Sequence, residues 1–364
     1  MDITEPIENI PGDKMHIKSI KMDKYYPDEE GFAALFVSVR LFLDDLYSAF
    51  SVCLRLVSSW EIALYLVNAA TAAAFYMYYT VADGSYLSSK ISFSLLSVAI
   101  IFPLTFQMNE TFIRRDLALG YLADFKALIC NITAGCCIWD FPNPITKESY
   151  GGRSNLPRDF YLDTRDICLA MCKELHLLLS LPVTTTGRFH VFAYHARKHR
   201  RMGEYAAEHA SQVSCLTRLL MRQVEILKKH GMPSNEASRI NQYVWILQAR
   251  VEALFQIKQY RTPQSTRSYT RFYLCVLPWF IGPYFAWLGS RNMQDEVYET
   301  NPGFAMATAV LYETLLVGLM LQTRQLEDVF LPQGVDNVRM EEDMIDHMRL
   351  INSHVNFALE KLES

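Results

Sequence analysis

Lys90–Arg115, with the sequence KISFSLLSVAIIFPLTFQMNETFIRR, is the stretch that decides the predicted fold. No charged side chain interrupts it from Ile91 to Asn109, a length close to what an α-helix needs to cross the hydrocarbon core of a bilayer. Arg114 and Arg115 follow at its end, and Lys or Arg beside a span is typical of the cytoplasmic side. Pro103 lies inside the stretch, where a membrane helix tolerates proline if neighbours or water satisfy the freed carbonyl. The stretch therefore predicts a transmembrane helix.

Apolar residues recur along this helix in two rows. One row holds Ile91, Leu95 and Ala99, and the other holds Val98, Phe102 and Phe106. In a ring of subunits each position would form a girdle around the axis, and apolar girdles gate water-filled pores by dewetting. Periodicity alone favours the alternative that these side chains face lipid or a core, since every apolar helix has such rows.

The composition predicts an integral membrane protein with sizeable soluble parts. Only 20% of the 364 residues are charged, 51% are hydrophobic, and the apolar residues are gathered into blocks. The formal net charge of -4 does not suggest a nucleic-acid partner. The polar segment 1–26 lacks the features of a secretory signal. The eight cysteines show no zinc-ribbon spacing, and we expect most to be reduced, buried thiols.

Four spans are expected: residues 62–79, the stretch described above, and residues 272–290 and 305–322. Arginines before the third span and after the fourth, with an acidic loop between them, place both termini and the central region in the cytosol. The predicted fold is all-α and polytopic. Its parts are a cytosolic N-terminal arm and surface helix (1–58), transmembrane helices 1 and 2 (59–110), a cytosolic helical region (111–270), transmembrane helices 3 and 4 (271–324) and a cytosolic C-terminal segment (325–364). Alanines 63, 70 and 74 offer the first span a small-residue packing face.

The region from Ile91 to Ile132 resembles the second membrane helix and following cytosolic helix of the bestrophin-like membrane proteins. The positions that match are Phe93, Leu95, Leu96, Phe106, Phe112 and Arg114. Gln107 stands where the family usually has arginine, and Arg115 where it has tryptophan. These two departures mark a distant relative.

Two further stretches are similar to the same family. IKQYRTPQSTRSYTRFYLCVLPWFIGP, residues 257–283, is similar to the approach to the third span, and GLMLQTRQLEDVFLPQGVDN, residues 318–337, to the exit from the fourth. The resemblance implies a pentameric channel for small anions such as chloride or bicarbonate, with the second helix lining a narrow neck. The alternative is a non-conducting membrane scaffold or trafficking protein that retains the fold. Without inverted repeats or paired broken helices, a secondary transporter has little support.

No motif predicts an enzyme or a cofactor, since the sequence holds no glycine-rich phosphate loop, GxSxG or HExxH. Within HARKHRR, residues 195–201 before a helix expected over 202–229, His195 and His199 have a metal-ligand spacing. The neighbouring cations favour a solvated basic face instead, which can attract anions or lipid headgroups. Animal bestrophins hold calcium with an acidic cluster after the fourth span. Here Glu327, Asp328 and Asp336 are spread out, so we expect no metal site.

Glu313 is an acid near the middle of the fourth span, and its role is a separate prediction. Intramembrane carboxyl groups normally face the bundle interior or water. If Glu313 faces an aqueous vestibule, Glu313→Gln should shift the anion-to-cation preference and flatten the pH dependence of flux. If it is an interior group, protonated or hydrogen-bonded to a neighbour such as Thr314, Tyr312 or a tyrosine of another span, the substitution should change only assembly or stability. Ion flux in liposomes, measured over a range of pH, distinguishes the two.

Overall fold

The computed structural model describes residues 32–57, 59–83, 93–137, 156–181, 193–260, 263–290, 301–331 and 337–363. Every regular element in these ranges is an α-helix, so the predicted all-α class is confirmed. Ile91 lies outside the described residues. Leu95, Val98 and Ala99 lie in a helix, but their side chains are outside the description.

Helix α1 (Phe32–Val57) belongs to a unit separate from the rest of the chain. Its apolar residues Phe42, Leu46 and Phe50 are exposed at a spacing of four, beside the acidic Asp44 and Asp45. This amphipathic pattern is typical of helices that lie at a membrane surface. The predicted helix is confirmed, and its position on the membrane stays a prediction.

Among the described residues, four helices are long and apolar enough to cross a membrane. They are α2 (Trp60–Asp83), the first part of α3 (Phe93–Cys137), α7 (Gln264–Ser290) and α8 (Pro302–Leu326). They share a core to which Ile62, Leu104, Leu277 and Val317 contribute, and we call this group the span bundle. The four predicted spans are confirmed in number and order.

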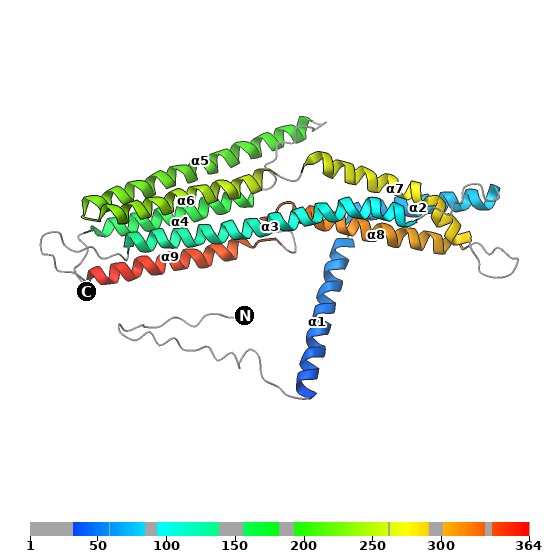
Figure 1. Ribbon diagram of the computed structural model, residues 1–364, viewed down its shortest axis with the longest axis horizontal. Helices are drawn as coiled ribbons and strands as arrows, with labels where there is room; N and C mark the ends of the chain where they lie inside the picture. The colour runs from blue at the N-terminus through cyan, green and yellow to red at the C-terminus, as the bar shows by residue number, and fades with distance from the viewer. Residues whose placement is uncertain are drawn as a thin grey trace. The chain divides into compact units, whose positions relative to one another are not determined.

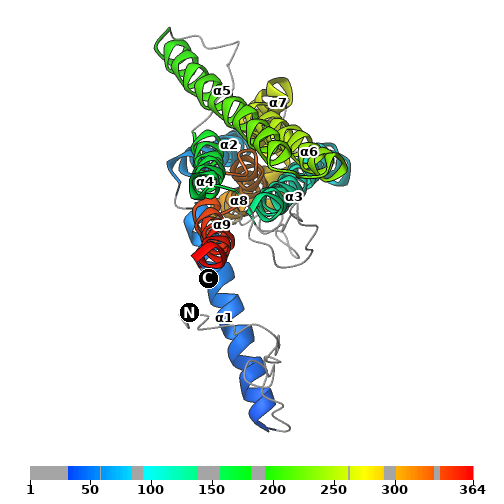
Figure 2. The ribbon, with the colours of Figure 1, turned by 90° about the vertical axis from the view of Figure 1, so that its left-hand side faces the viewer.

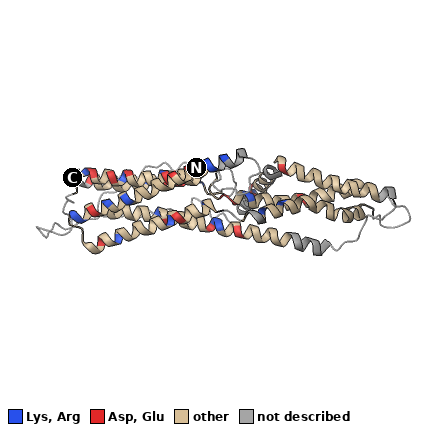
Figure 3. Ribbon diagram, turned by 90° about the horizontal axis from the view of Figure 1, so that it is seen from above, with Lys and Arg blue, Asp and Glu red and all other residues tan. Residues whose placement is uncertain are grey.

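The remaining helices form a second group, which we call the charged bundle. It consists of the second part of α3 with α4 (Arg158–Ser180), α5 (Ala193–Lys229), α6 (Ser234–Gln259) and α9 (Met340–Glu363). Phe125, Met171, Leu247 and Ile351 lie in its core. Figure 3 shows Lys, Arg, Asp and Glu distributed over this bundle, whereas the span bundle is nearly free of them.

Helix α3 runs through both bundles without a break (Figure 1). Its 45 residues are about 67 Å long at the rise of an α-helix, roughly twice the thickness of a bilayer core. The other two connections between the bundles are interrupted, between α6 and α7 and between α8 and α9. One continuous helix thus connects the second span to the charged bundle.

Helices α5 and α6 form an antiparallel hairpin closed by a tight turn. Gly231 has φ 101°, a left-handed conformation that favours glycine. The amide of Met232 donates to the carbonyl of Leu227, and that of Gly231 donates to Lys228, which is a Schellman motif. The predicted helix end is confirmed. The predicted start at Met202 was wrong, because α5 begins at Ala193 and includes the basic run.

The seven cysteines whose side chains are described are free thiols. Four are buried, namely Cys136, Cys137, Cys168 and Cys172, while Cys215 and Cys275 are exposed. Burial raises the pKa of the Cys168 thiol to about 11, so it stays protonated and unreactive near neutral pH. The expectation of buried thiols therefore holds for α3 and α4 but not for α5 and α7.

His347 of α9 gives a prediction for acid stability. Burial, reinforced by the nearby Lys126 and opposed by Asp343, lowers the pKa of His347 to about 4 from its ordinary 6.5. Between pH 6.5 and 4 the unfolded chain therefore binds a proton here that the folded chain excludes, and stability falls as pH falls. We expect His347→Gln to make the decrease in melting temperature over this window shallower.

The control for this experiment is His230→Gln, which changes an exposed histidine on the α5–α6 turn. Melting temperatures in detergent, measured at several pH values, should have the wild-type slope for this variant. Equal slopes for His347→Gln and the wild type would contradict the prediction.

Candidate functional site

The first half of α3 has one packed face and one uncovered face. Leu104, Gln107 and Thr111 are buried; Leu104 belongs to the core of the span bundle, and Gln107 accepts a hydrogen bond from Thr270 of α7. Phe102 and Phe106 lie on the other side, with exposed fractions of 68% and 59%. Exposed phenylalanines one turn apart are unusual on a surface that faces only water, so this face meets lipid or another protein surface.

A groove runs along the uncovered face. It encloses about 840 Å³ between α3 and the start of α7, where Pro263 and Thr266 form its other wall. The rings of Phe102 and Phe106 lie side by side in it, with centroids 6.2 Å apart. Glu110 and Arg114 line the groove beyond the phenylalanines, so it passes from an apolar to a charged part.

Of the predicted pore-lining residues, Phe102 and Phe106 lie together on this face. Ile91, Leu95, Val98 and Ala99 are not described at the level of side chains. Both rows therefore stay predictions as pore-lining sets. Side-chain contacts are described only for members of the second row, Phe102 and Phe106.

Glu313 does not belong to the uncovered face. Its exposed fraction is 1%, and it lies on the buried side of α8 beside core residues such as Leu316 and Val317. Its Oε1 has no hydrogen-bond partner within the described part of the chain. This burial favours the interior role over an exposed ring of charge. A role in permeation stays a prediction.

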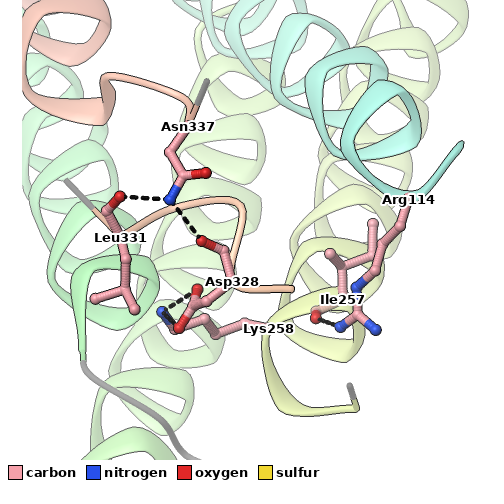
Figure 4. Close-up of polar contacts among 6 residues, drawn as sticks. All are labelled: Arg114, Ile257, Lys258, Asp328, Leu331 and Asn337. Atoms are coloured by element: carbon pink, nitrogen blue, oxygen red, sulfur yellow. Dashed lines mark hydrogen bonds and ion pairs between the residues drawn. The ribbon is translucent and has the colours of Figure 1, made fainter. Parts of the chain in front are cut away.

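A polar junction lies where α6 gives way to α7 and α8 ends (Figure 4). The Lys258 ammonium donates to both carboxylate oxygens of Asp328, at 2.8 and 3.0 Å, and both side chains are buried. Arg267 donates to Glu327 at 3.1 Å. Arg114 of α3 donates to the carbonyl of Ile257, so all three chain segments meet here.

Asn337 completes the junction from the segment before α9. Its side-chain nitrogen donates to the backbone carbonyls of Asp328, at 2.9 Å, and Leu331, at 2.7 Å. These carbonyls lie just past the end of α8, where no further helical N–H groups are available to bond them. The turn after the fourth span is thus held by Asn337 together with the backbone bond from Val338 to the carbonyl of Val329.

The junction explains what the acidic pair after the fourth span does. Glu327 and Asp328 are each bonded to a protein cation, so their charges are already compensated without calcium. Asp336 lies outside the described residues. No cluster of three or more His, Cys, Asp or Glu residues suited to a metal ion occurs among the residues described, and the side chains of His195 and His199 are not among them.

The first and third spans are joined by polar contacts that were not predicted from the sequence. Asn68 of α2 donates to the carbonyl of Cys275 at 2.7 Å and accepts from the indole of Trp279 at 3.1 Å. Pro278 disturbs the carbonyls one turn before it in α7, which gives Asn68 an acceptor inside an apolar bundle. The sequence feature that could have indicated this contact was an asparagine in one predicted span together with a proline in another.

The predicted small-residue face of the first span was wrong. Ala63 and Ala74 are exposed, whereas Ala69, Ala72 and Ala73 are buried. A position that requires a small residue lies instead at Gly282 of α7, where an added Cβ would lie 2.1 Å from the ring of Tyr76. The ring of Tyr76 occupies the space left by the missing side chain of Gly282, so a tyrosine and not an alanine row makes this contact.

No family model matches the sequence, and no curated protein matches it. Solved structures do. A crystal structure of a bacterial bestrophin homologue from Klebsiella pneumoniae, carrying a point mutation, has 13% identity and a TM-score of 0.56, and the match covers 81% of this chain and 97% of that one. A structure of a homologue from the same organism, phased with zinc, gives the same four values. A crystal structure of a membrane protein variant has 11% identity and a TM-score of 0.58, covering 82% and 100%. The chain has a bestrophin-like fold.

This likeness confirms the resemblance seen in the sequence. Four apolar helices and neighbours that are membrane proteins make the chain an integral, multi-pass membrane protein. At 11–13% identity the likeness shows the bestrophin-like fold alone, so the chemistry of the uncovered face has to be argued from this chain's own residues.

The junction yields a prediction for stability. Removing one partner of a buried ion pair leaves an uncompensated charge and costs about 3–5 kcal/mol, whereas replacing both with apolar groups costs far less. We expect Lys258→Met to lower the melting temperature in detergent strongly, and Lys258→Met with Asp328→Leu to recover most of the loss.

Lys228→Met is the matched control, because Lys228 pairs with Glu225 on the exposed surface of α5 and such pairs contribute at most about 1 kcal/mol. If the double variant is as unstable as Lys258→Met alone, the prediction is wrong. The loss of stability then comes from losing the Lys258 charge or its packing, and not from leaving Asp328 unpaired.

Proposed function

We propose that the protein is a bestrophin-like channel for passive permeation of small anions such as chloride or bicarbonate. The pathway follows α3, and several copies of the chain assemble around it as a homo-oligomeric ring, expected to be a pentamer. Neither an enzymatic activity nor a nucleic-acid partner is part of this proposal.

The uncovered face of α3 is the observation that carries the proposal. Phe102 and Phe106 are the large apolar side chains that a dewetting constriction requires, and they are not used in packing within one chain. A constriction of this kind holds no ion tightly, so ions leave as readily as they enter. The bestrophin-like fold supports placing this face toward a central axis.

Gln107 favours the second candidate, a membrane scaffold or trafficking protein that keeps the fold without conducting. It stands at the position where the resemblance expects arginine, and it is buried, accepting a hydrogen bond from Thr270 of α7 at 3.2 Å. Gln107 also lines the groove on α3, and because its side chain is neutral it supplies no positive charge to an anion pathway there. The two candidates differ in one measurable property, which is flux.

We expect the purified protein, reconstituted in liposomes, to pass chloride, and Phe102→Ala with Phe106→Ala to raise the flux severalfold or relax selectivity. The physical reason is that truncating both rings widens an apolar constriction and lets water enter it. Flux is measured by an ion-sensitive dye, and mass in detergent gives the number of subunits.

The matched control is Leu311→Ala with Leu315→Ala, which truncates two exposed apolar side chains at the same spacing on α8. This pair should leave the flux unchanged. Absence of flux from a correctly assembled wild type would favour the scaffold. Flux that is insensitive to the phenylalanine variant, or a stable monomer, would rule out the pathway along α3 in a ring.

A further inference from the structure

The start of α5 extends beyond the helix that pairs with it. In the hairpin closed at Gly231, α5 has 37 residues and α6 has 26. The difference leaves about eleven residues of α5, roughly 16 Å at helical rise, past the last residue of α6. We call these residues, Ala193 to Gly203, the overhang.

The overhang lies at the end of the charged bundle where the spans begin. Helix α6 ends at Gln259, and the third span starts within α7 at Thr266. Because α5 is antiparallel to α6, its first residues are level with the first turns of α7, and Figure 1 shows the beginning of α5 reaching past α6 toward α7. Figure 2, which looks along the molecule, shows this part of α5 standing away from the other helices. The overhang is therefore near the level at which the apolar spans enter the membrane.

The overhang is basic throughout. Its sequence, AYHARKHRRMG, holds four Lys or Arg residues and no acid. Arg197, Arg200 and Arg201 are exposed, and no ion pair of these guanidinium groups occurs within the described residues. Exposed Tyr205 follows one turn after Arg201, an aromatic of the kind found at membrane interfaces.

From this placement we propose that the overhang of α5 is a docking surface for the anionic headgroups of the bilayer in which the chain is inserted. Clusters of Lys and Arg next to a span are attracted by negative lipids, and each such side chain strengthens the attraction about fivefold. Arginine also binds phosphate oxygens through a two-pronged set of donors. The lateral position of the overhang brings it to lipids beside the protein rather than to the groove on α3. This surface does not depend on whether the protein conducts.

The test uses the full-length protein in nanodiscs of phosphatidylcholine, with and without phosphatidylserine. Amide hydrogen exchange is followed by mass spectrometry in peptides covering residues 193–205. Phosphatidylserine should slow this exchange at least about fivefold, and salt near 1 M, where charges are screened beyond about 3 Å, should abolish the difference. The combined substitutions Arg197→Gln, Arg200→Gln and Arg201→Gln should remove it as well.

Two further variants separate charge from fold. Arg197→Lys, Arg200→Lys and Arg201→Lys should keep most of the effect, because the charge remains. Arg218→Gln, Arg222→Gln and Lys229→Gln remove three exposed cations from the other end of the same helix, and should leave exchange at 193–205 as in the wild type.

Three results would overturn the proposal. The first is equal exchange in the two lipid compositions, and the second is a lipid effect that survives the triple glutamine variant. The third is slowing by inorganic phosphate in neutral nanodiscs that equals the slowing by phosphatidylserine, which would assign the surface to a soluble anion instead.

Discussion

The structure depends on a constraint on α3: in lipid, the backbone amides and carbonyls have to be satisfied within the helix itself. Helix α3 meets this requirement across the membrane and then continues into the charged bundle, so it is the one uninterrupted connection between the two bundles in the described chain. The other two connections break at the junction. There Arg114 and Asn337 donate to backbone carbonyls at the ends of α6 and α8, and Lys258 pairs with the carboxylate of Asp328.

Between Phe102 and Thr111, α3 buries polar side chains as well as Leu104, and it leaves two large aromatic side chains exposed. Its inward side carries Gln107 and Thr111, and its outward side carries Phe102 and Phe106. Polar side chains are satisfied inside the bundle, while aromatic rings cover the exterior. Such an arrangement is stable where the exterior is apolar, which applies to lipid and to the same face of another copy. This surface of α3 is thus suited to contact with lipid or with another copy of the chain.

The sequence predicted the spans, their order and the end of the helix at Lys229, because each rests on local composition. It did not predict that Lys258 pairs with Asp328, because 70 residues separate them and pairing at such distances follows from helix packing. The wrong start of α5 has a local cause, since the run from His195 to Arg201 lacks apolar periodicity although its residues are acceptable in a helix. The first span lacks a distinctive alanine row, and nothing in its sequence indicated that Tyr76 would lie against Gly282.

The position of α9 has a consequence for how the chain is made. Its Met344, Ile351 and Val355 fill the core of the charged bundle between α3 and α4, yet they are synthesised after the fourth span. The core of the charged bundle can therefore be completed only after α8 has been synthesised. A nascent chain that fails to insert α8 correctly would leave an apolar seam open along α3 and α4, where quality-control proteins that recognise exposed hydrophobic surface can bind. Because α9 is needed to complete the charged bundle, a complete charged bundle indicates that the spans before α9 have been inserted.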